Sequence, residues 1–208
     1  MWALVEDNAI TKIINNPKAM VINDVRHSRN IFSFRLTNEE REAIGIYEIV
    51  IDNSNKKDEA YYNNTNQSFN FADGVVTASF GSATAKLLED RNEVDEAGEP
   101  LLDDKGNQVV TKGLKSQKKD IIKSQASGLL EPTDWYNHKA LDDATFTIPA
   151  NITTYRASVR TKSNEMETAI DNASDVDALA TLYEYVNTGT EENPVMERPL
   201  GEFPTLEI

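Results

Sequence analysis

The sequence contains no cysteine among its 208 residues. Disulfide bonds and thiolate metal sites are therefore excluded, and the fold must be held by packing or by association with other chains. We expect the chain to be made in a reducing cytoplasm. Residues 1–10 show no basic segment followed by an apolar one, and no apolar run approaches the roughly 18 residues that span a bilayer. We therefore expect neither export nor insertion into a membrane.

Basic residues are scarce, with 21 against 35 acidic residues and a net charge of -14. Such a charge repels phosphate backbones and anionic lipid headgroups, so we expect no nucleic-acid and no membrane partner. The densest basic cluster falls on a predicted helix, where a solvated polar face is the usual explanation and a local anion or partner contact is the alternative. Its members are Lys112, Lys115, Lys118, Lys119 and Lys123.

Recognisable catalytic and ligand-binding patterns are also missing. The only two histidines, His27 and His138, have no histidine, cysteine or carboxylate at metal-binding spacing. The nucleophile-elbow, zinc-protease and nucleotide-binding templates all fail. The acidic pairs at 95–96 and 103–104 superficially resemble a calcium loop, but the alternating ligands and the closing glutamate are absent, so we predict plain turns. We predict no enzyme activity, no cofactor, and no catalytic or metal-binding residue.

Apolar residues make up 39% of the chain, enough for a core, and the length suits one large domain or two small ones. We favour two halves of the α+β class. Residues 1–82 predict a β-rich domain with a strand pair in 17–34 around a loop that carries Arg26 to Arg29, a strand over 46–51, and one short helix. Local signals within this half are the turn at 6–8, the capping box of Thr37 and Glu40, Gly45 as a helix stop, and the Asp73–Gly74 hairpin turn.

The rest of the chain predicts a mainly helical half that carries a β-hairpin insertion. Over 83–113 we expect a helix start at SATAKLLED and a protruding hairpin, and over 114–187 a helical module. In that module a long helix begins after Pro149, and a last helix, capped by Ser174, packs against it as a hairpin. The long helix carries an apolar stripe of Ile152, Tyr155, Val159, Met166 and Ile170. Residues 188–208, ending with Leu206 and Ile208, predict an extended apolar segment that docks on its own fold or on a neighbouring subunit.

Several segments, spread over nearly the whole chain, resemble a family of small tail proteins of marine tailed phages, especially cyanophages. The most specific part is the order LL, TDW, IP, YR and VR between residues 129 and 160. The segments are NNPKAMVIND, LTNEEREAIGIYEI, SFNFADGVVTASFGSATAK, SGLLEPTDWY, IPANITTYRASVRTKSNEMETAIDNASDVDALATLY and RPLGEFPTLEI.

The resemblance implies a virion tail structural protein of the fibre or baseplate region, which forms a homo-oligomer and contacts fibre, baseplate or tail-tube subunits. The alternative is a tail-fibre assembly chaperone that is absent from the virion, and a glycan-degrading enzyme is the weakest of the three readings. The family's matching positions have structural roles. We expect Trp135 to fill the core beside Leu129 and Leu130, Pro149 to start the long helix, and Arg156 and Arg160 to form ion pairs on a helix face or at an interface.

Overall fold

A curled five-stranded β-sheet forms the centre of the first of two compact units, which consists of residues 1–84. In the computed structural model, which describes residues 1–206, the strand order of this sheet is β2-β1-β5-β8-β7. All neighbouring strands are antiparallel except β5 and β8, which are parallel. The strands are β1 (Trp2–Glu6), β2 (Ala9–Ile14), β5 (Ile46–Asp52), β7 (Gln67–Ala72) and β8 (Val75–Phe80). The edge strands β2 and β7 contact each other, so the sheet curls toward closure.

Both faces of this sheet bury apolar side chains, because successive residues of a strand point to opposite sides. One face packs Ala3, Val5, Ile49, Val76 and Ala78 together. The other face packs Leu4, Ile14, Ile22, Ile31 and Ile46. The two-residue turns of the hairpins carry positive φ angles at Asp7, Asn8, Asp73 and Gly74, as predicted for these turn residues.

Short elements cover the second face: β3 (Met20–Ile22), β4 (Val25–His27), the 3-10 helix η1 (Arg29–Phe32) and α1 (Asn38–Glu42). The strand pair predicted over 17–34 turns at Asn23–Asp24 and not around Arg26 to Arg29, because both of these residues adopt the left-handed conformation that a two-residue turn requires. Ile31 and Phe32 belong to η1. The capping box of Thr37 and Glu40 is confirmed, and Gly45, at φ +80°, ends the turn after α1.

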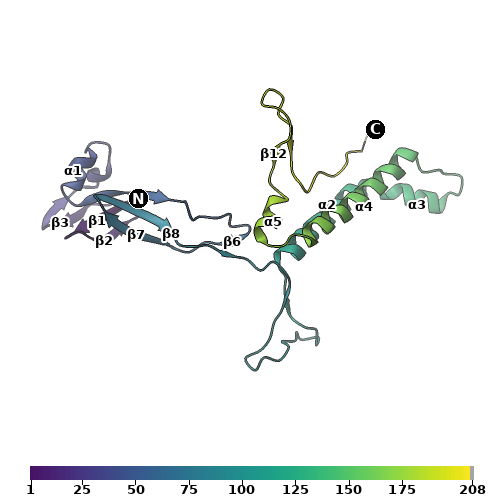
Figure 1. Cartoon of the computed structure of the whole chain (residues 1–208), viewed down its shortest axis with the longest axis horizontal. Helices are drawn as coiled ribbons and strands as arrows, with labels where there is room; N and C mark the ends of the chain where they lie inside the picture. Colours follow the sequence, from purple (N-terminus) through teal and green to yellow (C-terminus); the bar gives the residue numbers. More distant parts are fainter. Residues whose placement is uncertain (207–208) are drawn as a thin grey trace. The chain divides into compact units, whose positions relative to one another are not determined.

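The second unit begins at Ala85 and is organised around two antiparallel helices, α2 (Leu114–Leu130) and α4 (Ala150–Asp171), which lie side by side in Figure 1. The apolar stripe predicted for the long helix is buried along its whole length. The 3-10 helix η2 (Glu131–Thr133) and α3 (Asp134–Asp142) follow α2 directly. Two projecting hairpins and a terminal helix complete the unit: β10 (Arg91–Asn92) with β11 (Val110–Thr111), α5 (Val176–Thr181), and β12 (Val186–Asn187) with β13 (Met196–Glu197).

The fold class is α+β as predicted, but three details of the second half differ from the sequence-based prediction. SATAKLLED forms no helix: β9 (Thr84–Ala85) pairs with β6 (Tyr62–Asn63), and the chain then runs extended. The extended course has a physical reason, since the Leu87 and Leu88 carbonyls accept from the first N–H groups of α2, at 2.8 and 3.0 Å. The last helix is capped by Asp175, and the helix that packs along α4 is α2.

Among residues 1–206, no helix is long and apolar enough to cross a membrane.

Candidate functional site

The elbow between α2 and α3 is fixed by α4. Pro132 has no N–H group, so the α-helical hydrogen-bond pattern stops at Leu130. Arg156 of α4, only 7% exposed, donates to the Leu130 carbonyl at 2.9 Å, to the Thr133 hydroxyl and to the Asp134 carboxylate at 2.7 Å. These bonds add to the bond that the Thr133 hydroxyl donates to the Leu130 carbonyl at 2.8 Å, and they complete the hydrogen bonding at this end of α2.

The same network explains the most specific part of the sequence pattern. The Tyr155 hydroxyl lies 3.3 Å from the Leu129 carbonyl and donates to it, one residue before the Arg156 contacts. The LL and TD segments are thus brought into contact with YR, which lies more than 20 positions later in the sequence: Leu130 and Arg156 are 26 positions apart. The prediction of an ion pair for Arg156 is confirmed, with Asp134 as its partner inside the chain. Arg160 is exposed and donates to the Arg156 carbonyl at 3.4 Å.

Beyond the elbow lies a partly exposed aromatic cluster, here called the aromatic tip: Trp135, Tyr136 and Phe146 with the exposed Lys139 and Leu141. The Trp135 and Tyr136 rings stack at 3.8 Å between centroids, and Phe146 lies 6.3 Å from each. The Lys139 ammonium is 4.4 Å from the Phe146 centroid. No residue of α3 is buried, Trp135 is 50% exposed and Leu141 is 84% exposed.

Trp135 therefore does not fill the core beside Leu129 and Leu130, and that prediction is wrong. The elbow directs α3 away from the α2–α4 contact, so the indole packs on its own neighbours. A turn after α3 returns Phe146 to the cluster: the Asp143 carboxylate accepts from the Thr145 hydroxyl and N–H, and the Phe146 N–H donates to the Asp143 carbonyl at 3.0 Å. The Thr145 bonds hold the pKa of Asp143 below its ordinary value.

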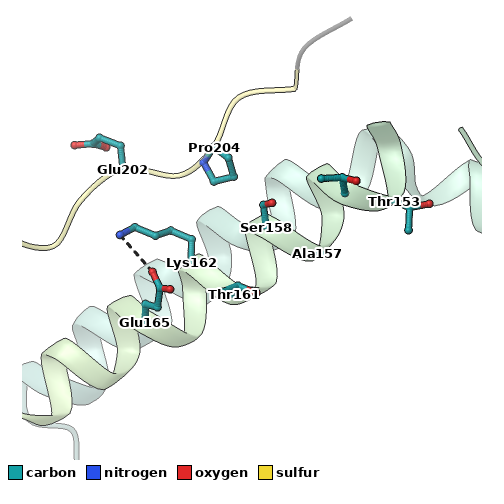
Figure 2. Close-up of a pocket in the computed structure, with 9 residues that line it drawn as sticks. Thr153, Ala157, Ser158, Thr161, Lys162, Glu165, Glu202 and Pro204 are labelled. Carbon is teal, nitrogen blue, oxygen red and sulfur yellow. Dashed lines mark ion pairs between the residues drawn. The ribbon is translucent and has the colours of Figure 1, made fainter. Parts of the chain in front are cut away.

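A second exposed feature is the groove between α4 and the C-terminal segment. It has a volume of about 650 Å³, and Figure 2 shows the Lys162–Glu165 ion pair on the helix side, with Glu202 and Pro204 on the other side. The remaining lining is short and uncharged: Thr153, Thr154, Ala157, Ser158 and Thr161. Because Lys162 is paired with Glu165, the groove offers hydroxyl and methyl groups more than free charge.

The C-terminal segment docks on its own fold, one of the two alternatives predicted for it. Leu200 is 2% exposed, and Phe203 and Leu206 pack against a cluster of α2 and α4 side chains. Ile208, which the sequence also placed in this apolar segment, lies outside the described residues.

The protruding hairpin predicted within 83–113 is present, and it branches. In this forked arm (residues 91–111) three short ladders meet at one point. The N–H of Glu93 donates to Val109, that of Val109 to Leu101, and that of Leu101 to Glu93, at 2.8–2.9 Å, which closes a ring of three hydrogen bonds. The Gln108 side-chain nitrogen faces the same three carbonyls at 2.7, 3.1 and 3.0 Å.

Sequence reasoning did not find this branching, although an eight-residue repeat could have indicated it: VDEAGEPL is followed directly by LDDKGNQV. Each copy forms one turn, in which an aspartate accepts from two backbone N–H groups. Asp95 accepts from Ala97 and Glu99, and Asp103 accepts from Lys105 and Asn107, at 2.8–3.0 Å. These contacts form the turns predicted for the two acidic pairs.

The lysine cluster of α2 is used inside the fold. Lys112 pairs with Asp120 at 2.6 Å, Lys119 with Asp171 at 2.7 Å and Lys123 with Glu167 at 3.4 Å. Lys115 pairs with Glu89 and also donates to the Asp171 carbonyl at 2.9 Å. Lys118 lies over the Tyr183 ring at 4.7 Å. The cluster is therefore better explained by these contacts within the unit than by an anion site.

The two histidines lie on different elements, His27 in β4 and His138, exposed, in α3. Within the described part of the chain, no group of three or more histidine, cysteine, aspartate or glutamate side chains is placed to hold a metal ion. No family model, curated protein or solved structure matches the chain. The functional argument therefore depends on the residues themselves.

Proposed function

We propose that this protein is a structural component of a phage tail, in the fibre or baseplate region, and that it attaches to another tail protein through the aromatic tip. The resemblance of the chain's segments to small phage tail proteins supports the class of function. The observation that carries the attachment site is that α3 presents Trp135 and Leu141 outward while burying none of its own residues.

The aromatic tip has the properties of a preorganised binding surface. Aromatic rings bury large areas and are enriched among residues that dominate binding energy. Arg156 already fixes the direction of α3 through three bonds to the elbow, so little freedom is lost on binding. A partly exposed ring cluster, formed by a helix that buries none of its residues and by the turn after it, has no evident value for folding, but it suits an interface.

The first experiment is quantitative mass spectrometry of purified particles of the phage that encodes this chain, relative to the major capsid protein. We expect a constant copy number in a multiple of three or six, because fibres and baseplates have these symmetries. Absence from the particles, with the protein abundant in the infected-cell lysate, would instead make it an assembly factor.

A matched pair of variants then tests the tip. Trp135→Ala should lower incorporation into particles by about tenfold or more, the loss expected when a central aromatic contact is removed. Ile121→Ala removes a comparably exposed apolar side chain, 48% exposed, from α2 and should leave incorporation unchanged. Equal incorporation of both variants would exclude the tip as the attachment site.

A further inference from the structure

One segment of the first unit has the opposite charge to the rest of the protein. Residues 18–35, here called the basic segment, contain four basic residues and one acidic residue, in a chain of net charge -14. Arg26, Arg29 and Arg35 are exposed and form no ion pair within residues 1–206. All lysines of the α2 cluster form an ion pair or lie over an aromatic ring. The guanidinium groups of Arg26, Arg29 and Arg35 are therefore a prominent set of unpaired positive charges that lie close together in the sequence.

The basic segment also exposes apolar side chains. Phe34 is 95% exposed, and Val21, which pairs across the β3–β4 ladder with Arg26, is 59% exposed. Arginine beside exposed aromatic and aliphatic residues is the composition of an interface core with a charged rim. The chemistry that fits is an apolar surface edged by carboxylates.

The forked arm of the second unit has this chemistry. Val94, Leu102 and Val110, eight residues apart and one from each ladder, are 56%, 55% and 43% exposed. Paired residues of a ladder point to the same side, and so do residues two apart on one strand. The pairs are Val94 with Pro100, Leu102 with Gln108 and Asn92 with Val110. Val94, Leu102 and Val110 therefore lie on a common face.

Three carboxylates of the same arm, those of Glu96, Glu99 and Asp104, are exposed and form no ion pair in the described structure. The other hairpin of the unit, β12–β13, has two such carboxylates to offer, those of Glu191 and Glu192, since Glu197 accepts from Thr188. The ring of backbone bonds also orders the forked arm in advance.

We propose that the basic segment of one copy binds the forked arm of a second copy, so that the protein associates head to tail. The two surfaces differ, so the contact is heterologous and each copy retains one free surface of each kind; repetition gives a ring or an open stack. The proposal does not depend on the tail assignment, because it concerns the purified protein alone.

The test uses two charge-reversed variants of the full chain, studied by sedimentation at several concentrations. The first is Arg26→Glu with Arg29→Glu and Arg35→Glu, and the second is Glu96→Lys with Glu99→Lys and Asp104→Lys. We expect the wild type to gain mass with concentration and each variant to stay monomeric. An equimolar mixture should associate, because the second variant's basic segment meets the first variant's native arm.

Two controls make the result specific. Glu191→Lys with Glu192→Lys alters exposed carboxylates of the other hairpin and should leave association within about twofold of wild type. Raising the salt from about 0.1 M to about 1 M should weaken it by about tenfold, because the Debye length falls from about 10 to about 3 Å.

Three outcomes would overturn the proposal. The first is a wild type that stays monomeric at every concentration. The same result is expected if the basic segment is bound by another part of its own copy. The second is a mixture of the two variants that fails to associate while circular dichroism shows both folded. The third is a basic segment that binds a duplex DNA oligonucleotide in preference to a second copy.

Discussion

Each unit contains one buried arginine that donates to backbone carbonyl groups outside its own helix, and the two differ in how far along the sequence their partners lie. Arg41, 8% exposed, donates to the carbonyls of Ser33 and Leu36, both at 2.8 Å and within eight residues of it. Arg156, 7% exposed, contacts residues 22 to 26 positions earlier. The first stabilises a local loop, whereas the second joins two helices and directs a third.

The comparison extends to the other elements of the two units. In the first unit most elements contribute to one of two apolar clusters around the sheet. In the second, α3 and the strands of both projecting hairpins contain no buried residue. Backbone hydrogen bonds and aspartate turns order these projections, so their surfaces can be changed at little cost to the core. This division is why we assign partner contacts mainly to the second unit.

The largest expected effect comes from the core of the helix pair. Ile170→Ala removes a fully buried side chain, at 0% exposure, and should lower the free energy of unfolding by about 2–5 kcal/mol. Urea denaturation followed by the helical circular dichroism signal measures this loss. Ile121→Ala, on the exposed side of α2, should cost less than about 1 kcal/mol. Similar losses for both would contradict the assignment of stability to the α2–α4 contact.

The arginine comparison is tested by two parallel variants. Arg156→Met should destabilise by about 2–3 kcal/mol, because it leaves the buried Thr133 hydroxyl and the Leu130 carbonyl without this donor. Arg41→Met should cost about 1–2 kcal/mol, since its loop can loosen locally. Amide hydrogen exchange should become faster across α3 and α4 in Arg156→Met, and only near residues 33–38 in Arg41→Met. Arg160→Met serves as the control with no expected change.

A smaller effect is expected in acid. Gly113, at the start of α2, provides no side-chain cap, and a side chain there would collide with the Glu89 backbone. Asp90 takes this role by accepting from the Gly113 N–H at 2.8 Å and from the Ser116 hydroxyl at 2.9 Å, bonds that hold the pKa of Asp90 below its ordinary value.

Because the folded-state pKa of Asp90 lies below the unfolded one, its contribution is complete above the ordinary carboxyl range and is lost as the pH falls through the folded-state value. We expect Asp90→Asn to reduce the difference in denaturation midpoint between about pH 7 and about pH 3, where carboxylates titrate. An unchanged difference would show that Asp90 does not stabilise α2. Exposed Asp104, replaced by Asn, is the matched control.

The smallest effect on global stability is expected in the forked arm. Gln108→Leu removes the donor that faces three carbonyls, and global unfolding should change by less than about 0.5 kcal/mol because the arm is exposed. The N–H groups of Glu93, Leu101 and Val109 should nevertheless exchange faster. Protection that stays at the wild-type level would mean that the backbone ring alone orders the junction.

Much of the fold follows from signals that act over a few residues. The turn at Asp7–Asn8, the capping box of Thr37 and the stripe along α4 were predicted because each depends on neighbours within one or two turns of chain. Failures of prediction occurred where distant groups compete. Residues 83–90 have helical propensity but run extended, because their carbonyls bind the first N–H groups of α2.

The candidate binding surfaces could likewise be predicted from the sequence only in part. The sequence by itself determined the α+β class, the position of the projecting arm and the residues of the LL, TDW and YR pattern. Only the tertiary structure decided that Arg156 is buried at the elbow, that Trp135 is exposed, and that β5 lies parallel to β8. The reason is that these outcomes depend on contacts between residues more than 20 positions apart, which no local propensity specifies.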